Sequence, residues 1–88
     1  MSEPAAYVYL LWCGPGRALY CGWGTDVPRR LAAHQQGRGA KYTRSRAPVE
    51  LAAAIPMPSV SAARREEARI KRLPRSEKLA LVDRHPPA

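Results

Sequence analysis

Two side chains that suit phosphate chemistry, Arg30 and His34, lie four residues apart in a segment with strong helix-start signals. Thr25 and Asp26 carry oxygens that can cap free backbone N–H groups, and a proline follows in the first turn, where a missing N–H costs little. These features predict a helix over Asp26–Gln36. Residues four apart share one face, so the helix presents a guanidinium beside an imidazole. The pair suits an anionic phosphodiester, although an ordinary solvated helix can carry the same residues.

A β-hairpin is predicted just before this helix. Tyr7–Trp12 is rich in aromatic and branched residues, Gly14–Gly16 has the strongest turn chemistry of the chain, and Ala18–Trp23 follows as the second strand. If Cys13 pairs with the first residue of the second strand, the alternation of side chains puts Cys13 and Cys21 on opposite faces of the sheet. We therefore expect no disulfide, and reduced cysteines are typical of a cytoplasmic protein.

The register of this hairpin decides whether its tyrosines can act together. With a four-residue loop, Tyr9 faces Gly22 and Tyr20 faces Leu11, all on one side of the sheet. The glycine leaves space above the Tyr9 ring, so the two tyrosine hydroxyls can share one site. A five-residue loop would reverse this parity. Tyrosine also favours strands for structural reasons, which is the plainer interpretation of either residue alone.

The second half of the chain predicts one more strand and two helices. Val49–Ile55 has the composition of a strand and is followed by proline. Ser59 or Ser61 can cap a helix that runs to about Leu73, where another proline prevents simple continuation. Arg75–Arg84 predicts a last helix.

A carboxylate falls within the apolar side of the first of these two helices. Its apolar stripe consists of Val60, Ala63, Ile70 and Leu73. Glu67 lies in this stripe, whereas Glu66 lies about 100° around the helix and faces solvent. A carboxylate on a buried face is costly unless it is paired or binds a metal. A salt bridge to a neighbouring arginine and a metal-binding role are equal alternatives for Glu67.

The segment after the first helix is a candidate nucleic-acid surface. Gly37–Arg46 interleaves cations with glycine and one tyrosine, a composition that can hold phosphates and stack a base. A merely solvated basic loop is the alternative. The candidate contacts on this loop and the preceding helix are Arg29, Arg38, Lys41, Tyr42, Arg44 and Arg46.

Length and charge restrict the class of protein. Eighty-eight residues predict one domain, residues 1–88, with a core over about residues 7–82. Fifteen Lys and Arg against seven Asp and Glu give a net charge of +8, which indicates a polyanionic partner. Nucleic acid is the first candidate and an acidic membrane the second. A membrane span is not expected, because the longest apolar run, Ala5–Cys13, is only of strand length. The N-terminus lacks the cationic region of a secretory signal, so a cytoplasmic location is expected.

Four stretches in this order resemble the GIY-YIG nuclease superfamily, and most of all its small single-domain bacterial members. The stretches are Tyr7-Val8-Tyr9, Tyr20-Cys21-Gly22, Thr25–His34 and Glu67–Lys71. The similarity extends from Tyr7 to about Val82. It implies an α/β (α+β) fold, with a small three-stranded antiparallel sheet flanked by helices in the order β-β-α-β-α-α.

The resemblance also assigns roles to particular residues. The two motif tyrosines, the essential arginine, a histidine where some relatives carry tyrosine and the metal-binding carboxylate correspond to Tyr9, Tyr20, Arg30, His34 and Glu67. Three positions depart from the family pattern: Tyr7 replaces the leading glycine, Cys21 replaces an isoleucine, and Trp23 stands where excision-repair relatives carry lysine.

The function that the resemblance implies is metal-dependent endonucleolytic cleavage of DNA, with a structure-specific role in repair or recombination as a further expectation. One Mg²⁺ or Mn²⁺ ion would bind at Glu67, and either Tyr9 or His34 would be the general base. The alternative is a catalytically weak or inactive nucleic-acid-binding module or adaptor on the same scaffold. A protein partner would fit this alternative if the surface around Trp12 and Trp23 proved exposed.

Overall fold

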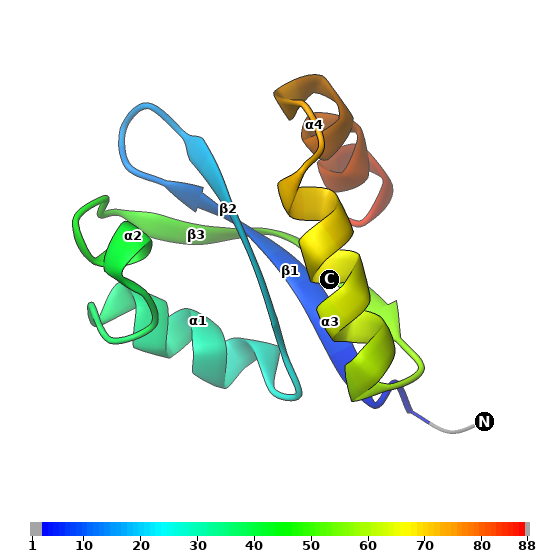
Figure 1. The fold of residues 1–88 in the computed structure, drawn as a ribbon. Coiled ribbons are helices and arrows are strands. Elements are labelled where there is room, and N and C mark those ends of the chain that lie inside the picture. Colours follow the sequence, from blue (N-terminus) through cyan, green and yellow to red (C-terminus); the bar gives the residue numbers. More distant parts are fainter. Residues whose placement is uncertain (1–2, 88) are drawn as a thin grey trace.

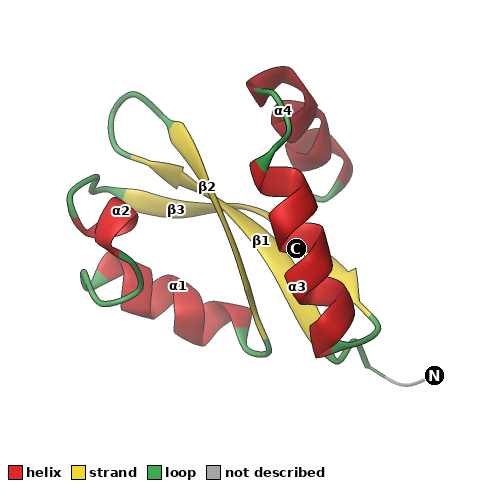
Figure 2. Ribbon diagram, in the orientation of Figure 1, coloured by secondary structure: helices red, strands yellow, loops and turns green. Residues whose placement is uncertain are grey.

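A three-stranded antiparallel sheet with helices on both faces forms the molecule (Figure 1, Figure 2). The computed structural model describes residues 3–87. Its elements are, in chain order, β1 (Ala6–Cys13), β2 (Ala18–Gly24), α1 (Val27–Gln35), α2 (Lys41–Arg44), β3 (Val49–Met57), α3 (Val60–Lys71) and α4 (Arg75–Arg84). This confirms the predicted α+β fold and its order of strands and long helices. The one-turn helix α2 was not predicted, and it lies in the loop expected to be a flexible basic surface.

The hairpin has the register predicted from its loop length. Cys13 pairs with the first residue of β2, Tyr9 lies opposite Gly22, and Tyr20 lies opposite Leu11. The two cysteines are free, buried and packed in clusters on opposite faces of the sheet. Burial raises the pKa of the Cys21 thiol to about 12, so this thiol stays protonated and unreactive at neutral pH.

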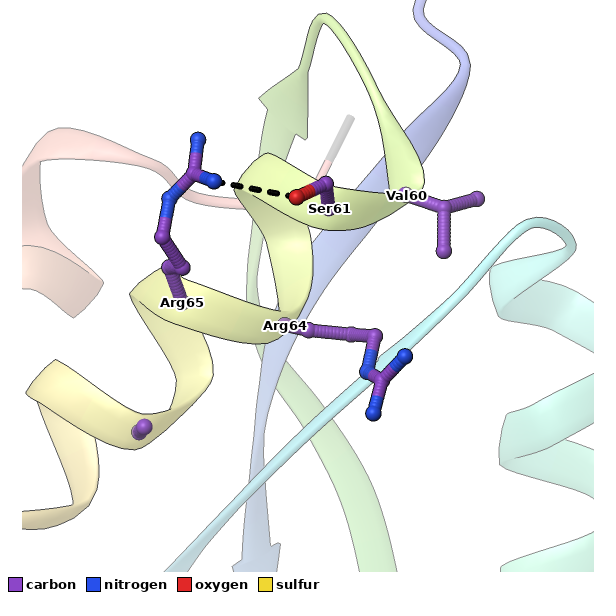
Figure 3. Close-up of a pocket in the computed structure, with 5 residues that line it drawn as sticks. Val60, Ser61, Arg64 and Arg65 are labelled. Atoms are coloured by element: carbon purple, nitrogen blue, oxygen red, sulfur yellow. Dashed lines mark hydrogen bonds between the residues drawn. The ribbon is translucent and has the colours of Figure 1, made fainter.

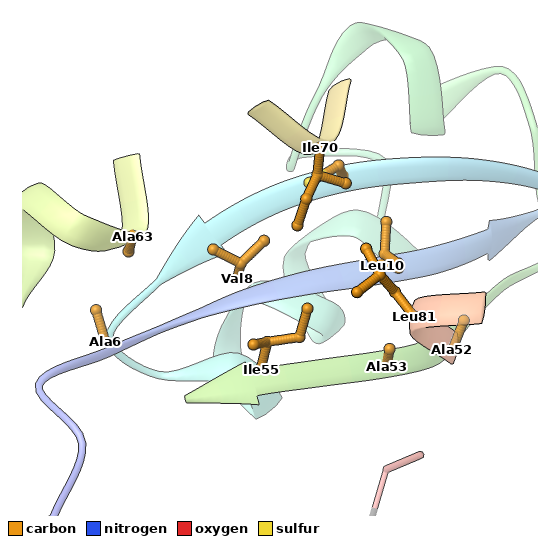
Figure 4. Packing of buried hydrophobic residues seen from close by; sticks show 10 residues of the cluster. Ala6, Val8, Leu10, Ala52, Ala53, Ile55, Ala63, Ile70 and Leu81 are labelled. Atoms are coloured by element: carbon orange, nitrogen blue, oxygen red, sulfur yellow. The ribbon is translucent and has the colours of Figure 1, made fainter. Parts of the chain in front are cut away.

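The central strand β1 contributes to both cores, which explains its continuous apolar sequence. On one face, α3 and α4 cover the sheet, and Ile70 and Leu81 lie over Val8 and Leu10 (Figure 4). On the other face, α1 covers a cluster formed by Tyr9, Leu11, Cys13, Val27 and Val49. The tyrosine side chains therefore belong to the α1 side of the sheet.

Side-chain caps set where the long helices begin. Asp26 caps α1 by accepting a hydrogen bond from the Arg29 backbone N–H at 3.1 Å. Ser59, rather than the alternative Ser61, caps α3 by accepting from the Ala62 N–H at 2.9 Å. The third strand continues past its predicted end to Met57, because β3 is an edge strand, where proline is tolerated.

The two tryptophans are half-buried and pack against the core beneath α3 and α4. Arg17 covers the Trp12 ring, with its guanidinium carbon 4.4 Å from the ring centroid. Within residues 3–87, the exposed large hydrophobic side chains are Tyr42 and Val60. An adaptor surface built on Trp12 and Trp23 therefore has no support here. No helix in the same range is long and apolar enough to cross a membrane.

The close packing of Tyr9 on β2 predicts that Gly22→Ala is destabilising. A Cβ at Gly22 would lie 2.5 Å from the Tyr9 hydroxyl oxygen, so the ring would have to move within a packed core. Overpacking of this kind costs about 1–3 kcal/mol. Gly16→Ala is the matched control, because a Cβ there meets no atom within 4 Å, and a change within about 0.5 kcal/mol is expected. Urea unfolding of both variants measures the difference, and equal free energies of unfolding would contradict the packing at Gly22.

Candidate active site

Tyr9 lies at the centre of a hydrogen-bonded cluster between β1 and α1. Its hydroxyl oxygen is 3.0 Å from Nε2 of His34 and accepts a hydrogen bond from Nε of Arg30 at 3.4 Å. Arg30 and His34 lie one turn apart on α1, on the side that packs against the sheet. Tyr9 and His34 are each only 1% exposed, whereas Arg30 is partly exposed. Three of the five predicted catalytic side chains thus meet through direct contacts.

His34 is more enclosed than a basic, solvated helix face would allow. Its Nδ1 is 2.8 Å from the hydroxyl oxygen of Thr43, the buried residue of α2. A Cβ on Gly39 would collide with the imidazole ring, so the chain crosses the ring at a distance that glycine alone permits. The solvated-helix alternative is therefore wrong for His34, because the segment expected to be flexible folds over it.

Tyr20 flanks the cluster from β2. Its ring centroid is 5.3 Å from that of His34, and it stacks on Tyr42 with centroids 5.6 Å apart and an angle of 22° between the planes. The guanidinium carbon of Arg46 lies 3.9 Å from the centroid of Tyr42. These contacts form a continuous series of side chains from the surface to the buried imidazole. Tyr42 already has two partners, so stacking of a nucleic-acid base on it would require one of them to move.

Glu67 approaches the same region from α3. Its side chain is 22% exposed, and its Oε1 lies 3.6 Å from Nζ of Lys71, which in turn sits 5.7 Å from the centroid of the Tyr20 ring. The neighbouring carboxylate behaves differently, because Glu66 makes a two-point ion pair with Arg69 at 2.7 Å. The predicted arginine salt bridge thus belongs to Glu66, whereas within residues 3–87 the ion pair of Glu67 is a longer contact with Lys71.

The site holds its central pair in the uncharged state. Burial raises the pKa of the Tyr9 phenol above its ordinary value, although Arg30 opposes this effect. Burial also lowers the pKa of His34, and the Arg30 charge lowers it further. The pKa of Tyr20 is raised by burial and then by the negative charge of Glu67. At neutral pH a neutral phenol therefore faces a neutral imidazole between a fixed cation and a carboxylate.

The predicted nucleic-acid contacts lie on α1 and on the segment that follows it. All six are exposed, and five of them lie on the segment from Arg38 to Arg46 that carries α2. A shallow hollow on α3 is lined by further basic side chains, Arg64 and Arg65, which were not among the predicted contacts (Figure 3). Arg65 donates to the hydroxyl of Ser61 at 3.0 Å, and Arg64 lies one turn before Glu67. Arg64 could have been predicted as a further contact from the sequence, because it lies one helical turn before Glu67.

No group of three or more His, Cys, Asp or Glu side chains that could hold a metal occurs within the described residues. Glu67 therefore offers a single carboxylate ligand. A hard cation that keeps several waters and binds substrate phosphate is compatible with such a site, whereas a zinc site with four protein ligands is not.

Known proteins share this sequence and fold. Residues 5–80 match the model of the GIY-YIG catalytic domain. The chain is 50% identical over 80 residues to a UPF0213 protein of Streptococcus sanguinis (strain SK36), covering 91% of both chains. It is 51% identical over 81 residues to a UPF0213 protein of Nitratidesulfovibrio vulgaris, covering 92% of this chain and 73% of the other.

A solved structure agrees with these relatives. The fold is similar to the solution NMR structure of a UPF0213 protein from Bacillus halodurans, with a TM-score of 0.55 and 45% identity over 89% of this chain and 82% of that chain. Together with the match over residues 5–80, this similarity shows that the chain belongs to the GIY-YIG family, whose catalytic domain is that of nucleases.

Proposed function

We propose that this protein is a divalent-metal-dependent endonuclease that hydrolyses phosphodiester bonds in DNA. The observation that carries the proposal is the position of the Tyr9 hydroxyl between Nε of Arg30 and Nε2 of His34. A hydroxyl held between a cation and a neutral base is poised to exchange protons. The net charge of +8 and the exposed cations on α1 and on the segment that carries α2 suit a polyanionic substrate.

Arg30 can serve the tyrosine and the substrate at once. Its Nε donates to Tyr9, which leaves the terminal amino groups of a partly exposed guanidinium for an oxygen of the scissile phosphate. Contact there offsets the negative charge that develops in the transition state. The exposed cations on the segment that carries α2 would hold neighbouring phosphates, and Arg64 would do so from α3.

Glu67 is the residue that would hold the metal ion, with waters and a phosphate oxygen as the remaining ligands. Mg²⁺ is the ion proposed, with Mn²⁺ as a substitute. When bound, the ion would supply Lewis-acid stabilisation of the phosphate oxygens. The weak contact of Glu67 with Lys71 leaves the carboxylate available, whereas Glu66 is engaged by Arg69.

The proton path follows from the order of the contacts. An in-line water attacks phosphorus, its proton passes to the Tyr9 oxygen, and the Tyr9 proton passes to Nε2 of His34. The O–P bond to water forms while the bond to the 3′ oxygen breaks, and the leaving 3′ oxyanion takes a proton from solvent, which gives a 5′-phosphate and a 3′-hydroxyl. Tyr9 and His34 thus act in series, rather than one of them alone as the general base. Tyr20, packed between His34 and Tyr42, would hold the imidazole side of the site in place.

The proposed role of the enzyme is DNA repair or recombination in the cytoplasm. Free cysteines on both faces of the sheet fit a reducing compartment. The competing proposal is a nucleic-acid-binding module without turnover. It predicts that neither the carboxylate of Glu67 nor the hydroxyl of Tyr9 is needed for the function of the protein.

Replacing the carboxylate of Glu67 separates catalysis from binding. Glu67→Gln should abolish Mg²⁺-dependent cleavage of labelled duplex, flap and junction DNA while changing DNA affinity by less than about threefold, because one lost anion does not remove a phosphate contact. Glu66→Gln is the matched control on the same helix, since its carboxylate is paired with Arg69, and it should cleave like the wild type. Equal loss in both variants, or in neither, would remove Glu67 from the mechanism.

The pH dependence of cleavage should report the buried imidazole. His34 must be neutral to accept a proton, so activity rises as pH rises through its pKa. Burial and Arg30 both disfavour the imidazolium, which puts this acidic limb below the ordinary value of 6.5. Single-turnover rates between pH 4.5 and 8 measure the limb, and His34→Gln should remove it. A midpoint above 6.5 would contradict the neutral, buried state of His34.

A further inference from the structure

Thr43 makes a second contact with the catalytic imidazole that the sequence did not indicate. It is 1% exposed, and its hydroxyl oxygen lies 2.8 Å from Nδ1 of His34. The same hydroxyl donates to the backbone carbonyl of Ala40 at 3.1 Å. A threonine at this buried position is thus hydrogen-bonded on both sides.

These two contacts fix the direction of the whole chain of hydrogen bonds. A carbonyl oxygen only accepts, so the single hydroxyl hydrogen of Thr43 points to Ala40. Toward His34 the hydroxyl can then only accept, which requires the proton of the neutral imidazole to sit on Nδ1. Nε2 is left with its lone pair facing Tyr9, and the Tyr9 hydroxyl must donate to it.

We propose that Thr43 is a positioning residue that holds His34 in the Nδ1–H tautomer, so that Nε2 is free to take the proton of Tyr9. The inference rests on the proposed nuclease function for its catalytic consequence, but the tautomer itself does not depend on that function. In the opposite tautomer Nε2 already carries a proton and has no lone pair with which to accept the proton of Tyr9. Thr43 therefore acts through His34 and touches no reacting atom.

The backbone around Thr43 is built to keep this contact. Gly39 lets the chain pass against the imidazole ring where a Cβ would collide with it. Ala40, which accepts the Thr43 hydrogen, is the N-cap residue of α2, and its carbonyl also accepts the Arg44 backbone N–H at 3.0 Å. The unpredicted helix α2 thus presents the hydroxyl oxygen of Thr43 to the imidazole as a hydrogen-bond acceptor. The carbonyl of Ala40 orients this hydroxyl from its other side.

Nitrogen NMR of the histidine ring tests the proposal directly. In ¹⁵N-labelled protein, long-range proton–nitrogen spectra distinguish the two tautomers of His34, and the His85→Gln variant assigns the signals, because the sequence holds two histidines. The wild type at pH 7.5 should show Nδ1 protonated. Thr43→Val keeps the shape but removes the acceptor, so the proton should move to Nε2, and Thr43→Ser should restore it to Nδ1. A wild-type ring protonated on Nε2 would overturn the proposal.

Cleavage by the same variants tests the catalytic consequence. Thr43→Val should lower the single-turnover rate about 100-fold, the lower range for loss of general base catalysis, and Thr43→Ser should recover most of it. DNA affinity should be equal in all three proteins. A folded Thr43→Val variant that keeps the wild-type tautomer and the wild-type rate would overturn the proposal. If the wild type cleaves none of the DNA substrates, the nuclease proposal fails while the ring spectra still decide the role of Thr43.

Discussion

The hydrogen bond between the Tyr9 hydroxyl and Nε2 of His34 joins two side chains that are 25 positions apart in the chain. Both groups are buried, so each must have its polar atoms paired, and the surrounding structure is arranged to satisfy that requirement. Arg30 donates to the phenol oxygen, and the hydroxyl of Thr43 pairs with the far nitrogen of the ring. No buried side-chain nitrogen or oxygen in the part of the chain that the structure describes lacks a partner.

Glycines make the close packing of this cluster possible. A Cβ at Gly22 would strike the Tyr9 hydroxyl, a Cβ at Gly24 would lie 2.9 Å from Cγ of Arg30, and one at Gly39 would strike the ring of His34. Two of these glycines are on β2 and the third is on the segment that leads to α2. The backbone thus replaces side chains as the wall of the site, which fixes the three functional groups with little freedom to move. The packing against these glycines accounts for the geometry of the three groups.

Local rules predicted much of the fold and part of the arrangement around Tyr9. Loop length set the parity of the hairpin and so put Tyr9 opposite Gly22, and the Asp26 cap fixed the start of α1 and hence the shared face of Arg30 and His34. The burial of His34 and its contact with Thr43 could not be predicted, because they depend on the segment after α1 folding back over the helix. That arrangement is tertiary, and a glycine-rich basic stretch carries no periodicity to signal it.

Glu66 and Glu67 show the same limit of prediction from sequence within a single helix. Spacing put Glu67 and Glu66 on different sides of α3, but it did not reveal that Glu66 would be the one paired with arginine. Side-chain partners across one helix turn depend on rotamers, which the sequence leaves open. Within residues 3–87 the ion pair of Glu67 is with Lys71, at 3.6 Å, and the negative charge of Glu67 acts on both tyrosines.

The most direct test of the account is the rate of DNA cleavage by Tyr9→Phe under single-turnover conditions, with folding checked by urea unfolding and DNA affinity measured in chelator. This change keeps the ring against Gly22 and removes only the hydroxyl that links Arg30 to His34. We expect a loss of about 100-fold or more in rate, with affinity unchanged, because the proton path is broken while the phosphate contacts remain. A folded variant that cleaves DNA at the wild-type rate would contradict the central role of the Tyr9 hydroxyl.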